Sequence, residues 1–435
     1  MNRVAFYTLG CKVNQYETEA MQELFEKRGY QIVECDEFAD IYVINTCTVT
    51  NLGDRKSRQF IRRAKKLNRD SIVAVVGCYS QVAPDEVKKM KEVDVILGTT
   101  HRDKIVDLCE KAILEDKKIN MVKDVNEHKE FENLNIADVK SKTRAYIKIQ
   151  DGCNQFCSYC IIPYARGPIR SRNLQSIIDE AQRLSEAGFK EVILTGIHVA
   201  SYGKDLNSIS LVDVIEEVAK VDGIERIRLS SIEPTLIDDQ FMRRVIKTNK
   251  LCDHFHLSLQ SGSDEVLNRM NRKYTTQQYK EIVKLIREYM PNVGITTDII
   301  VGFPGETDRE FQQTYDFVKE IGFSRIHVFK YSPRKGTPAS KFKKQIHGEI
   351  KQQRSDMLIA LGDKLMKDFN KKFLGHTLEV LFEENSKDNA DYMEGYTTNY
   401  IRVKAKADDS IKGKILPVKI ICEKDDILIG KIEEL

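Results

Sequence analysis

The chain is organised around the stretch Asp151-Gly-Cys-Asn-Gln-Phe-Cys-Ser-Tyr-Cys160, which places Cys153, Cys157 and Cys160 in a Cys-x3-Cys-x2-Cys spacing. Three thiolates this close together can hold one soft metal centre, but the next cysteine, Cys252, lies far along the chain. A zinc knuckle normally brings its fourth ligand within a short loop. A four-iron cluster has a use for the missing ligand, because its fourth iron stays open. The spacing favours an iron-sulfur cluster, with a zinc or disulfide site as the alternative.

The flanks of this loop carry a family resemblance. The run Gln-Asp-Gly-Cys-Asn-Gln-Phe-Cys-Ser-Tyr-Cys-Ile-Ile-Pro-Tyr-Ala-Arg-Gly, from Gln150 to Gly167, resembles the methylthiotransferase branch of the radical S-adenosylmethionine enzymes. The resemblance implies that the open iron holds the amino and carboxylate groups of S-adenosylmethionine. One electron then splits the sulfonium and releases a deoxyadenosyl radical. Cys153, Cys157 and Cys160 are the expected ligands of this catalytic cluster.

The composition describes an ordinary globular protein of 435 residues, with 41% apolar and 31% charged side chains. This length predicts two or three domains. The N-terminus lacks a signal-peptide layout and no apolar run reaches membrane-spanning length, so we expect a cytoplasmic protein without membrane contact. Ten cysteines are too few for a disulfide scaffold and would stay free to bind metal in a reducing compartment. A net charge of +3 decides nothing about nucleic acid.

Apolar strands and amphipathic helices alternate over residues 1–115, which predicts an α/β domain with a parallel sheet. The expected strands are residues 4–9, 41–45, 72–76 and 93–97. Cys11 follows the first of them, Cys47 the second and Cys78 the third. Because the carboxyl ends of parallel strands share one edge, these three thiols are expected to converge there. The alternative is that each is a small buried hydrophobe.

The methylthiotransferase resemblance implies a second four-iron cluster in this domain. Its ligands would be cysteines in the motifs Leu-Gly-Cys11-Lys-Val-Asn, Asn-Thr-Cys47-Thr-Val and Val-Gly-Cys78-Tyr. That cluster is thought to carry or deliver sulfur, again through an iron without a protein ligand. We therefore expect two [4Fe-4S] clusters and six cysteine ligands.

Basic side chains recur at helical spacing directly after Cys47. Arg55, Arg58 and Arg62 belong to a stripe with few acids near it in the sequence. Most charge runs are only solvated faces. A stripe beside a proposed cluster is also what contact with nucleic-acid phosphates would need, and such contact weakens as salt rises.

A polar linker is expected at residues 116–138, followed by a second domain over residues 139–370. Six strand-then-helix units predict a partial (β/α)6 barrel, which keeps its chemistry at the carboxyl ends of the strands. The expected strands are residues 144–150, 191–196, 226–230, 254–260, 294–301 and 325–331. The cysteine loop falls at that end of the first unit.

Polar residues and glycines follow the other strands at the same end. The family resemblance implies that segments at these places hold S-adenosylmethionine, and the candidates are Thr195, Gly196, Glu233, Gln260 and Asp298. Strand ends also need caps and turns, so each of these residues has a structural alternative. Arg166, Arg170 and Arg172 are candidates for a cofactor carboxylate, a substrate phosphate or a solvated loop. The sequence contains no Walker loop or dinucleotide fingerprint.

Strand-length segments with polar turns over residues 372–435 predict a small antiparallel β-barrel. This module resembles the TRAM domain, an RNA-binding appendage of many methylthiotransferases. It holds ten Lys and Arg against thirteen Asp and Glu, so it is acidic as a whole. Strand alternation nevertheless places Arg402, Lys404 and Lys406 on one face. This face predicts either an RNA contact or a solvated barrel wall.

The resemblance implies an enzyme that replaces a C–H hydrogen by a methylthio group on a tRNA base. The motif from Gly10 to Glu19 and the Asp151 loop look most like the branch that acts on N6-threonylcarbamoyladenosine beside the anticodon. Expected partners are the anticodon stem-loop of tRNA and an electron donor such as a flavodoxin or ferredoxin. The threonyl carboxylate of that base would need an Arg or Lys, which the sequence does not identify.

Three alternatives stay open. The same chemistry on N6-isopentenyladenosine is one, and methylthiolation of an aspartate in a ribosomal protein is another. The basic stripe and the Arg402 face favour RNA over a protein target. The third alternative, a non-enzymatic iron-sulfur RNA-binding protein, would yield no deoxyadenosine from S-adenosylmethionine.

Overall fold

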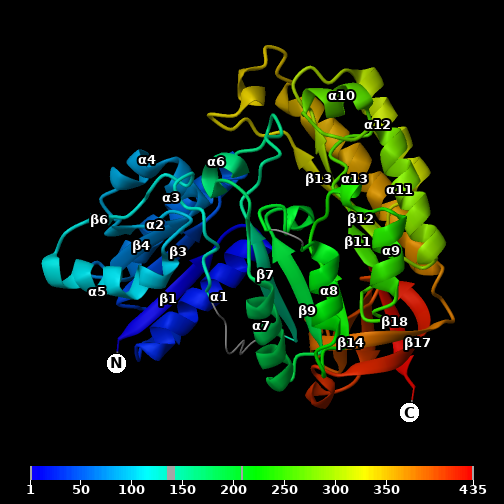
Figure 1. The fold of residues 1–435 in the computed structure, drawn as a ribbon, viewed down its shortest axis with the longest axis horizontal. Coiled ribbons are helices and arrows are strands. Elements are labelled where there is room, and N and C mark those ends of the chain that lie inside the picture. The colour runs from blue at the N-terminus through cyan, green and yellow to red at the C-terminus, as the bar shows by residue number, and fades with distance from the viewer. Residues whose placement is uncertain (1, 135–142, 207–208, 434–435) are drawn as a thin grey trace.

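The computed structural model describes residues 2–134, 143–206 and 209–433. An α/β domain, an open barrel and a small closed barrel follow one another along the chain (Figure 1). This is the predicted fold class. Four residues of the predicted linker, 135–138, lie outside the described residues, as do residues 139–142 at the start of the predicted second domain.

Six parallel strands form the N-terminal sheet in the order β2-β1-β3-β4-β5-β6. They are β1 (Arg3–Thr8), β2 (Gln31–Val33), β3 (Ile41–Thr46), β4 (Ile72–Gly77), β5 (Val95–Ile96) and β6 (Ile119–Asn120). The sequence did not predict β2 and β6, because two or three residues are too few to show a period. Since β6 pairs with β5, the sheet extends into the stretch expected to be linker.

Helices cover both faces of this sheet: α1 (Lys12–Lys27), α2 (Asn51–Leu67), α3 (Cys78–Val82), α4 (Pro84–Lys88) and α5 (Ile105–Glu115). Helix α1 contributes buried residues to two hydrophobic cores. Met21 and Phe25 pack into the core of the N-terminal domain, whereas Tyr16 and Ala20 pack into the core of the central barrel. The first two domains therefore share a helix.

The central barrel is an arc of six parallel strands. They are β7 (Arg144–Asp151), β9 (Glu191–Gly196), β10 (Arg226–Leu229), β11 (His254–His256), β12 (Gly294–Val301) and β13 (Arg325–Lys330). Single bridges, Ile227 to Leu251 and Ile232 to Leu257, join the sheet of β7, β9 and β10 to that of β11 to β13. A short β8 (Arg170–Ser171) pairs antiparallel with β7. Strand β13 ends the arc.

Amphipathic helices pack on the outside of the arc: α7 (Leu174–Glu186), α8 (Leu211–Ala219), α9 (Asp239–Ile246), α10 (Asp264–Arg269), α11 (Thr276–Tyr289) and α12 (Asp308–Ile321). Helix α12 begins at a capping box, in which Thr307 Oγ1 accepts from the backbone N–H of Glu310 and the Glu310 carboxylate accepts from that of Thr307. No helix within the described residues has both the length and the apolar character that a membrane crossing requires.

Helix α13 (Gly348–Lys371) leads to a closed five-stranded barrel in the order β14-β15-β16-β18-β17. Its strands are β14 (Thr377–Asn385), β15 (Tyr392–Thr397), β16 (Arg402–Lys406), β17 (Ile415–Lys424) and β18 (Ile427–Ile432). All pairings are antiparallel except that of β16 with β18. The sequence did not predict β15, whose Gly395 passes so close to β14 that a Cβ there would lie 2.2 Å from the Leu381 carbonyl oxygen.

Arginines on the inner strands of the central barrel hold this C-terminal module in place. Arg228 donates to the carbonyl oxygens of Thr397 and Thr398 at 3.1 and 2.9 Å, and Arg226 donates to that of Tyr396 at 3.2 Å. Arg144 pairs with Glu383 at 2.5 Å. The loop after β15 is thereby fixed against the opening of the arc.

Candidate active site

The Cys153 loop joins the end of β7 to the short helix α6 (Ile162–Arg166). Gly152 starts it with φ +74°, and a Cβ there would lie 1.8 Å from the carbonyl oxygen of Pro168. Only glycine fits this position. The backbone N–H of Cys153 donates to the carbonyl oxygen of Gly167 at 3.0 Å, and that of Cys160 donates to the carbonyl oxygen of Cys157 at 2.9 Å. The three thiols are therefore presented by one tightly folded loop.

Contacts from the far side of the barrel hold the middle of this loop. The backbone N–H of Ser158 donates to the carbonyl oxygen of Met270, and the carbonyl oxygen of Ser158 accepts from the backbone N–H of Ala339. Arg272 donates to Cys157 Sγ at 3.3 Å and to Glu233 Oε2 at 2.7 Å. Sequence reasoning did not single out Arg272, because it lies in a loop with no motif around it.

The second trio of cysteines lies at the carboxyl edge of the N-terminal sheet, as predicted from the strand order. Cys11 precedes α1, Cys47 follows β3 and Cys78 opens α3. Asn14 ties the first two loops together by donating to the carbonyl oxygens of Leu9 and Thr46 at 2.8 and 3.0 Å. Cys11 is exposed, Cys47 half-buried and Cys78 buried.

Each trio contains thiols whose ionisation is difficult without a metal. Burial raises the pKa of Cys153 to about 11, and burial likewise raises the pKa of Cys160 and of Cys47 to about 12. Neighbouring cysteines of the same trio add to each shift. Bound metal would reverse this balance, because a cation stabilises thiolates.

Three soft sulfur donors in each trio suit an iron-sulfur cluster. Within the described parts of the chain, no three His, Cys, Asp or Glu side chains converge tightly enough to hold a single metal ion. A four-iron cluster does not require such convergence, because each thiolate binds a different iron. The donor set therefore fits the cluster.

Arg166 connects the two trios. Its guanidinium is fully buried, and it donates to Cys78 Sγ at 3.4 Å and to Glu17 Oε1 at 2.5 Å. Lys148 adds ion pairs to Glu17 and Asp151 at 2.8 and 2.6 Å. Asp151 immediately precedes the Gly152-Cys153 turn, and Glu17 belongs to α1. One buried network therefore contacts both cysteine regions.

This network corrects the reading of Arg166, Arg170 and Arg172 as ligands of a cofactor carboxylate or of substrate phosphate. All three side chains are buried, and Arg172 pairs with Glu180. They hold protein carboxylates, so they are unavailable to an external anion. Sequence spacing cannot show this because Glu17 and Arg166 lie in different domains.

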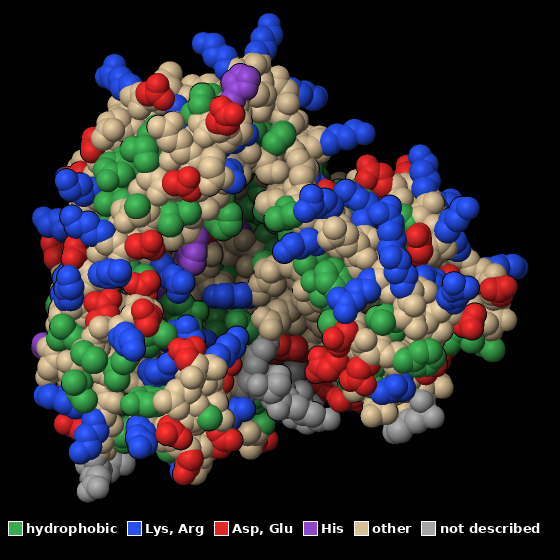
Figure 2. All heavy atoms as spheres, turned by 180° about the vertical axis from the view of Figure 1, so that it is seen from behind, with side chains coloured by type: hydrophobic (Ala, Val, Ile, Leu, Met, Phe, Trp, Pro, Cys, Tyr) green, Lys and Arg blue, Asp and Glu red, His purple; other side chains and the backbone are tan. Residues whose placement is uncertain are grey.

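A cavity of about 190 Å³ lies between the two cysteine regions. Cys160, Gln260 and Asp298 line it from the barrel, and Val49 and Thr50 line it from the loop after Cys47. Its remaining wall is largely apolar, with Ile161, Ile162, Ile300, Phe329 and Tyr331 among the lining residues. Figure 2 shows a hollow between the two lobes of the molecule.

The five candidate cofactor contacts separate into groups. Gln260 and Asp298 meet in this cavity, where the backbone N–H of Gln260 donates to the Asp298 carbonyl oxygen at 2.9 Å. Glu233 is linked to Cys157 by Arg272, which donates hydrogen bonds to both side chains. Thr195 is buried, and Gly196 packs closely on Gln150; neither lines the cavity.

Arg334 fixes the far rim of the cavity, and the sequence had not indicated it. It donates to Thr48 Oγ1 and Asp54 Oδ2, both at 2.6 Å. These partners follow Cys47, whereas Arg334 follows β13. The N-terminal domain and the end of the arc are thus joined on both sides of the cavity, by Arg166 and by Arg334.

The candidate RNA-contacting residues differ in availability. On α2, Arg55 and Arg62 are exposed, whereas Arg58 donates to the Tyr79 hydroxyl at 3.1 Å. Figure 2 shows Lys and Arg side chains gathered on the N-terminal domain beside the hollow. On β16, the predicted alternation is present, with Val403 and Ala405 buried.

The β16 cations are largely neutralised by neighbouring acids. Arg402 pairs with Glu394, and Lys404 with Asp388 at 3.0 Å and Glu394 at 3.6 Å. Lys406 is exposed. The face is thus less basic than strand alternation suggests, since Glu394 comes from the neighbouring strand β15.

Comparison with known proteins agrees with this layout. The model of the Radical SAM superfamily matches residues 147–318, and that of the uncharacterized protein family UPF0004 matches residues 3–98. A radical S-adenosylmethionine methyltransferase from Kitasatospora setae, TsrM, has a TM-score of 0.57 at 15% identity, covering 78% of this chain and 75% of its own. This likeness shows the fold alone.

Curated relatives match almost the whole chain. The threonylcarbamoyladenosine tRNA methylthiotransferase MtaB of Bacillus subtilis is 44% identical, covering 97% of this chain and 94% of its own, and that of Aquifex aeolicus is 41% identical, covering 96% and 100%. A tRNA-2-methylthio-N(6)-dimethylallyladenosine synthase of Bacillus subtilis is 38% identical, covering 98% and 84%. The chain therefore belongs to the radical S-adenosylmethionine methylthiotransferase family.

Proposed function

We propose that this enzyme methylthiolates N6-threonylcarbamoyladenosine beside the anticodon of tRNA, giving 2-methylthio-N6-threonylcarbamoyladenosine. The observation that carries the proposal is one cavity lined by Cys160 and by the loop that follows Cys47, within a chain similar over nearly its full length to MtaB proteins. Membership of the radical S-adenosylmethionine family implies that the enzyme uses S-adenosylmethionine and one four-iron cluster.

Each trio has a separate role in this proposal. Cys153, Cys157 and Cys160 would hold the catalytic cluster, and Cys11, Cys47 and Cys78 would hold a second one. When bound, the clusters and S-adenosylmethionine supply the radical, the sulfur and the methyl group. Cys78 and Cys157, one from each trio, are buried, which limits the access of water to these centres.

The side chains around the cavity would position the cofactor and the base. Gln260 and Asp298 offer hydrogen-bonding groups beside Cys160, and the apolar wall of Ile161, Ile162 and Ile300 suits a purine ring. Arg272 sets the position of Glu233 next to Cys157, so Glu233 acts at the cluster edge. Thr195 and Gly196 remain proposed contacts of the cofactor because they lie at the carboxyl end of strand β9.

The RNA would lie across the hollow, with Arg55, Arg58 and Arg62 on one side and Arg402, Lys404 and Lys406 on the other. Exposed Arg55 and Arg62 are the best placed to meet phosphates. We further propose a cytoplasmic location, where tRNA and an electron donor such as a flavodoxin or ferredoxin are available.

Nucleoside mass spectrometry of tRNA from cells lacking this protein tests the proposal. We expect loss of the methylthio group from threonylcarbamoyladenosine alone, with recovery on expression of the wild-type chain. Loss from N6-isopentenyladenosine instead would support the second candidate function, methylthiolation of that base. The 38% identity to a tRNA-2-methylthio-N(6)-dimethylallyladenosine synthase is the observation that favours it. Unchanged tRNA would contradict both.

Purified protein distinguishes an enzyme from a non-enzymatic iron-sulfur protein. Anaerobic incubation with reductant, S-adenosylmethionine and an anticodon stem-loop should yield deoxyadenosine and the methylthiolated nucleoside. Cys157→Ala is the matched control, because it removes one catalytic ligand and should abolish both products.

A further inference from the structure

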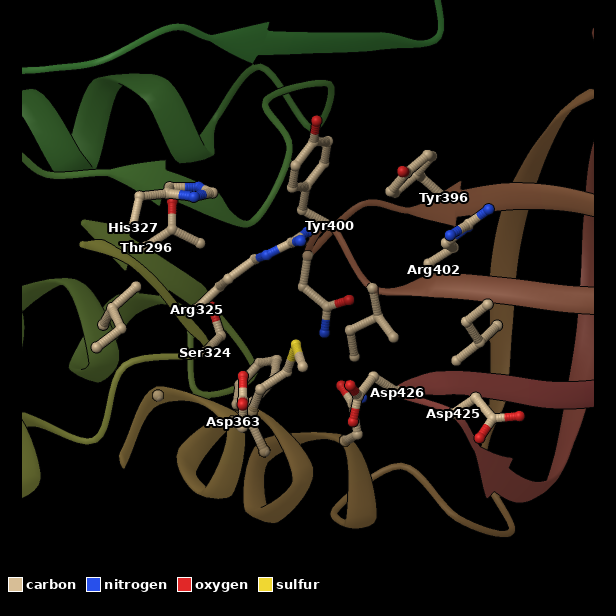
Figure 3. Close-up of a pocket in the computed structure, with 18 of the residues that line it drawn as sticks. Thr296, Ser324, Arg325, His327, Asp363, Tyr396, Tyr400, Arg402, Asp425 and Asp426 are labelled. Carbon is tan, nitrogen blue, oxygen red and sulfur yellow. The ribbon is translucent and has the colours of Figure 1, made fainter. Parts of the chain in front are cut away.

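A second, larger cavity of about 450 Å³ lies where the free edge of β13 meets α13 and the C-terminal barrel (Figure 3). Thr296, Arg325 and His327 line it from the central barrel, Tyr396 lines it from β15, and Tyr400 lines it from the loop that follows β15. Nothing in the two cysteine regions lines this cavity. Strands β12 and β13 nevertheless contribute lining residues both to this cavity and to the cavity beside Cys160.

The connection runs along the ladder of β12 and β13. Thr296 pairs with Arg325, Asp298 with His327, and Ile300 with Phe329. Asp298, Ile300 and Phe329 line the cavity at Cys160, whereas Thr296, Arg325 and His327 line the larger one. Arg325 is four residues before Phe329, or roughly 13 Å along the strand. A ligand held beside Cys160 can therefore extend a side chain toward Arg325.

Arg325 points into this space rather than into the core. On β13, Ile326 and Val328 pack against the core, whereas Arg325, His327 and Phe329 are exposed on the alternate positions. Figure 3 shows the Arg325 side chain reaching into the cavity on the side of Tyr400. Such a long extended cation is available to a bound anion.

Arg325 has no partner in the part of the chain that the structure describes. Its guanidinium makes no hydrogen bond or ion pair with any of the described residues. Arg402, the other Lys or Arg that lines the cavity, is paired with Glu394. Most of the arginines on the inner strands nearby are also paired, as Arg144 and Arg228 are with Glu383 and Glu191. Arg325 is therefore the cation of this cavity whose positive charge no described side chain neutralises, so it can bind an anionic ligand.

The remaining charges of the cavity indicate where the anion comes from. Asp363, Asp425 and Asp426 are exposed on α13 and the β17–β18 turn, where they form its outer wall. An RNA phosphate that approached Arg325 past this wall would meet three carboxylates, one of which, Asp426, pairs with Lys367 at 3.6 Å. An anion that reaches Arg325 from inside the barrel avoids them. The arrangement favours a carboxylate on a nucleoside side chain over the RNA backbone.

We propose that Arg325 determines substrate specificity by binding the threonyl carboxylate of N6-threonylcarbamoyladenosine in this cavity. The inference rests on the proposed function. The carboxylate is attached through N6, away from the reacting C2, so a base with C2 between the cysteine regions directs its side chain along the β12–β13 ladder. A guanidinium can then bind the carboxylate through two N–H donors. An isopentenyl group offers no charge for this contact.

The test compares wild type with Arg325→Gln on three anticodon stem-loops. One carries N6-threonylcarbamoyladenosine, one carries its methyl ester, and one carries N6-isopentenyladenosine. Arg243→Gln is the matched control, because Arg243 is an exposed arginine of α9 remote from both cavities. The measurements are kcat/KM for the methylthiolated nucleoside and the rate of deoxyadenosine release without RNA.

We expect Arg325→Gln to lower kcat/KM on the free carboxylate roughly 10- to 100-fold, the range for a lost hydrogen bond to a charged group. Wild type should show a similar loss on the methyl ester, and the variant little further loss, because both changes remove the same contact. Deoxyadenosine release without RNA should match wild type, and Arg243→Gln should behave as wild type throughout.

Two results would overturn the inference and leave the proposed function intact. Equal losses for Arg325→Gln on the carboxylate and the methyl ester would mean that Arg325 binds RNA phosphate. Unchanged kinetics would mean that it binds nothing. Wild-type protein that modifies only the isopentenyl stem-loop would instead overturn the proposed function, and the assignment of Arg325 with it.

Discussion

Arg166 Nε lies 3.4 Å from Cys78 Sγ, although the two residues belong to different domains. Arg166 is in the helix that follows Cys160, and Cys78 follows the fourth strand of the N-terminal sheet. The same guanidinium pairs with Glu17 and Asp151. The distance between the two cysteine regions is thus set by a buried ion network, which makes their geometry a property of the whole chain.

Replacing Arg166 should destabilise the protein as a whole. Arg166→Ala leaves buried Glu17 with Arg102 and Lys148, and Lys148 is shared with buried Asp151; loss of one partner in a buried pair costs about 3 kcal/mol. Urea unfolding of the cluster-free protein measures the effect. Arg243→Ala, at an exposed pair with Asp239, should stay within about 0.5 kcal/mol of wild type. Equal stability of the two variants would contradict a structural role for the network.

The same network predicts how stability depends on pH. Burial alone would raise the pKa of Glu17, but Arg102, Arg166 and Lys148 outweigh it and lower the pKa from 4.5 to about 2. The resulting stability, about 3 kcal/mol, is present above pH 4.5 and is lost as the pH falls toward 2. Glu17→Gln should be less stable at neutral pH and lose less on acidification, as followed by urea unfolding between pH 7 and pH 3.

The exposed residue Glu225, which pairs with Lys190, provides the comparison for that experiment. Glu225→Gln should follow the wild-type pH curve. A Glu17→Gln variant with the wild-type curve would show that Glu17 does not remain ionised in the folded protein.

Removing one cysteine from either trio should remove one cluster. After anaerobic reconstitution, Cys11→Ala and Cys153→Ala should each retain roughly half of the wild-type iron and sulfide, because a four-iron cluster with two thiolates is poorly held. Only Cys153→Ala should also lose the spectral response to S-adenosylmethionine. Cys422→Ala, at an exposed position far from both trios in the fold, should keep its full iron content. Wild-type iron in Cys11→Ala would contradict a second cluster.

The availability of the basic residues predicts how each contributes to RNA binding. Arg62→Ala should weaken stem-loop binding and lower the slope of log affinity against log salt by about 1, as expected for one phosphate contact. Arg402→Ala should lower that slope less, since Glu394 already neutralises this side chain. Fluorescence anisotropy between low and physiological salt measures both. A larger effect for Arg402→Ala would reverse the assignment.

The order of elements and the places of the cysteines follow from local sequence. Strand and helix periods reveal a parallel sheet, an open barrel and a terminal β-barrel, and each cysteine of the N-terminal trio follows a strand whose carboxyl end must lie on the same edge. The cysteine spacing and the flanking residues of the Cys153 loop predicted an iron-sulfur cluster there. Short or irregular strands such as β2, β6 and β15 could not be found this way, because they show no period.

The sequence by itself determined which elements form, which thiols can gather and to which family they point, because these depend on spacing within a few turns of chain. Only the tertiary structure decided which charges are already matched. Glu17 removes Arg166 from the candidate ligands and Glu394 partly neutralises Arg402, whereas Arg325 faces a cavity and pairs with none of the residues that the structure describes. The physical reason is that an ion pair depends on distance in space, and these partners come from elements far apart in the chain or on neighbouring strands.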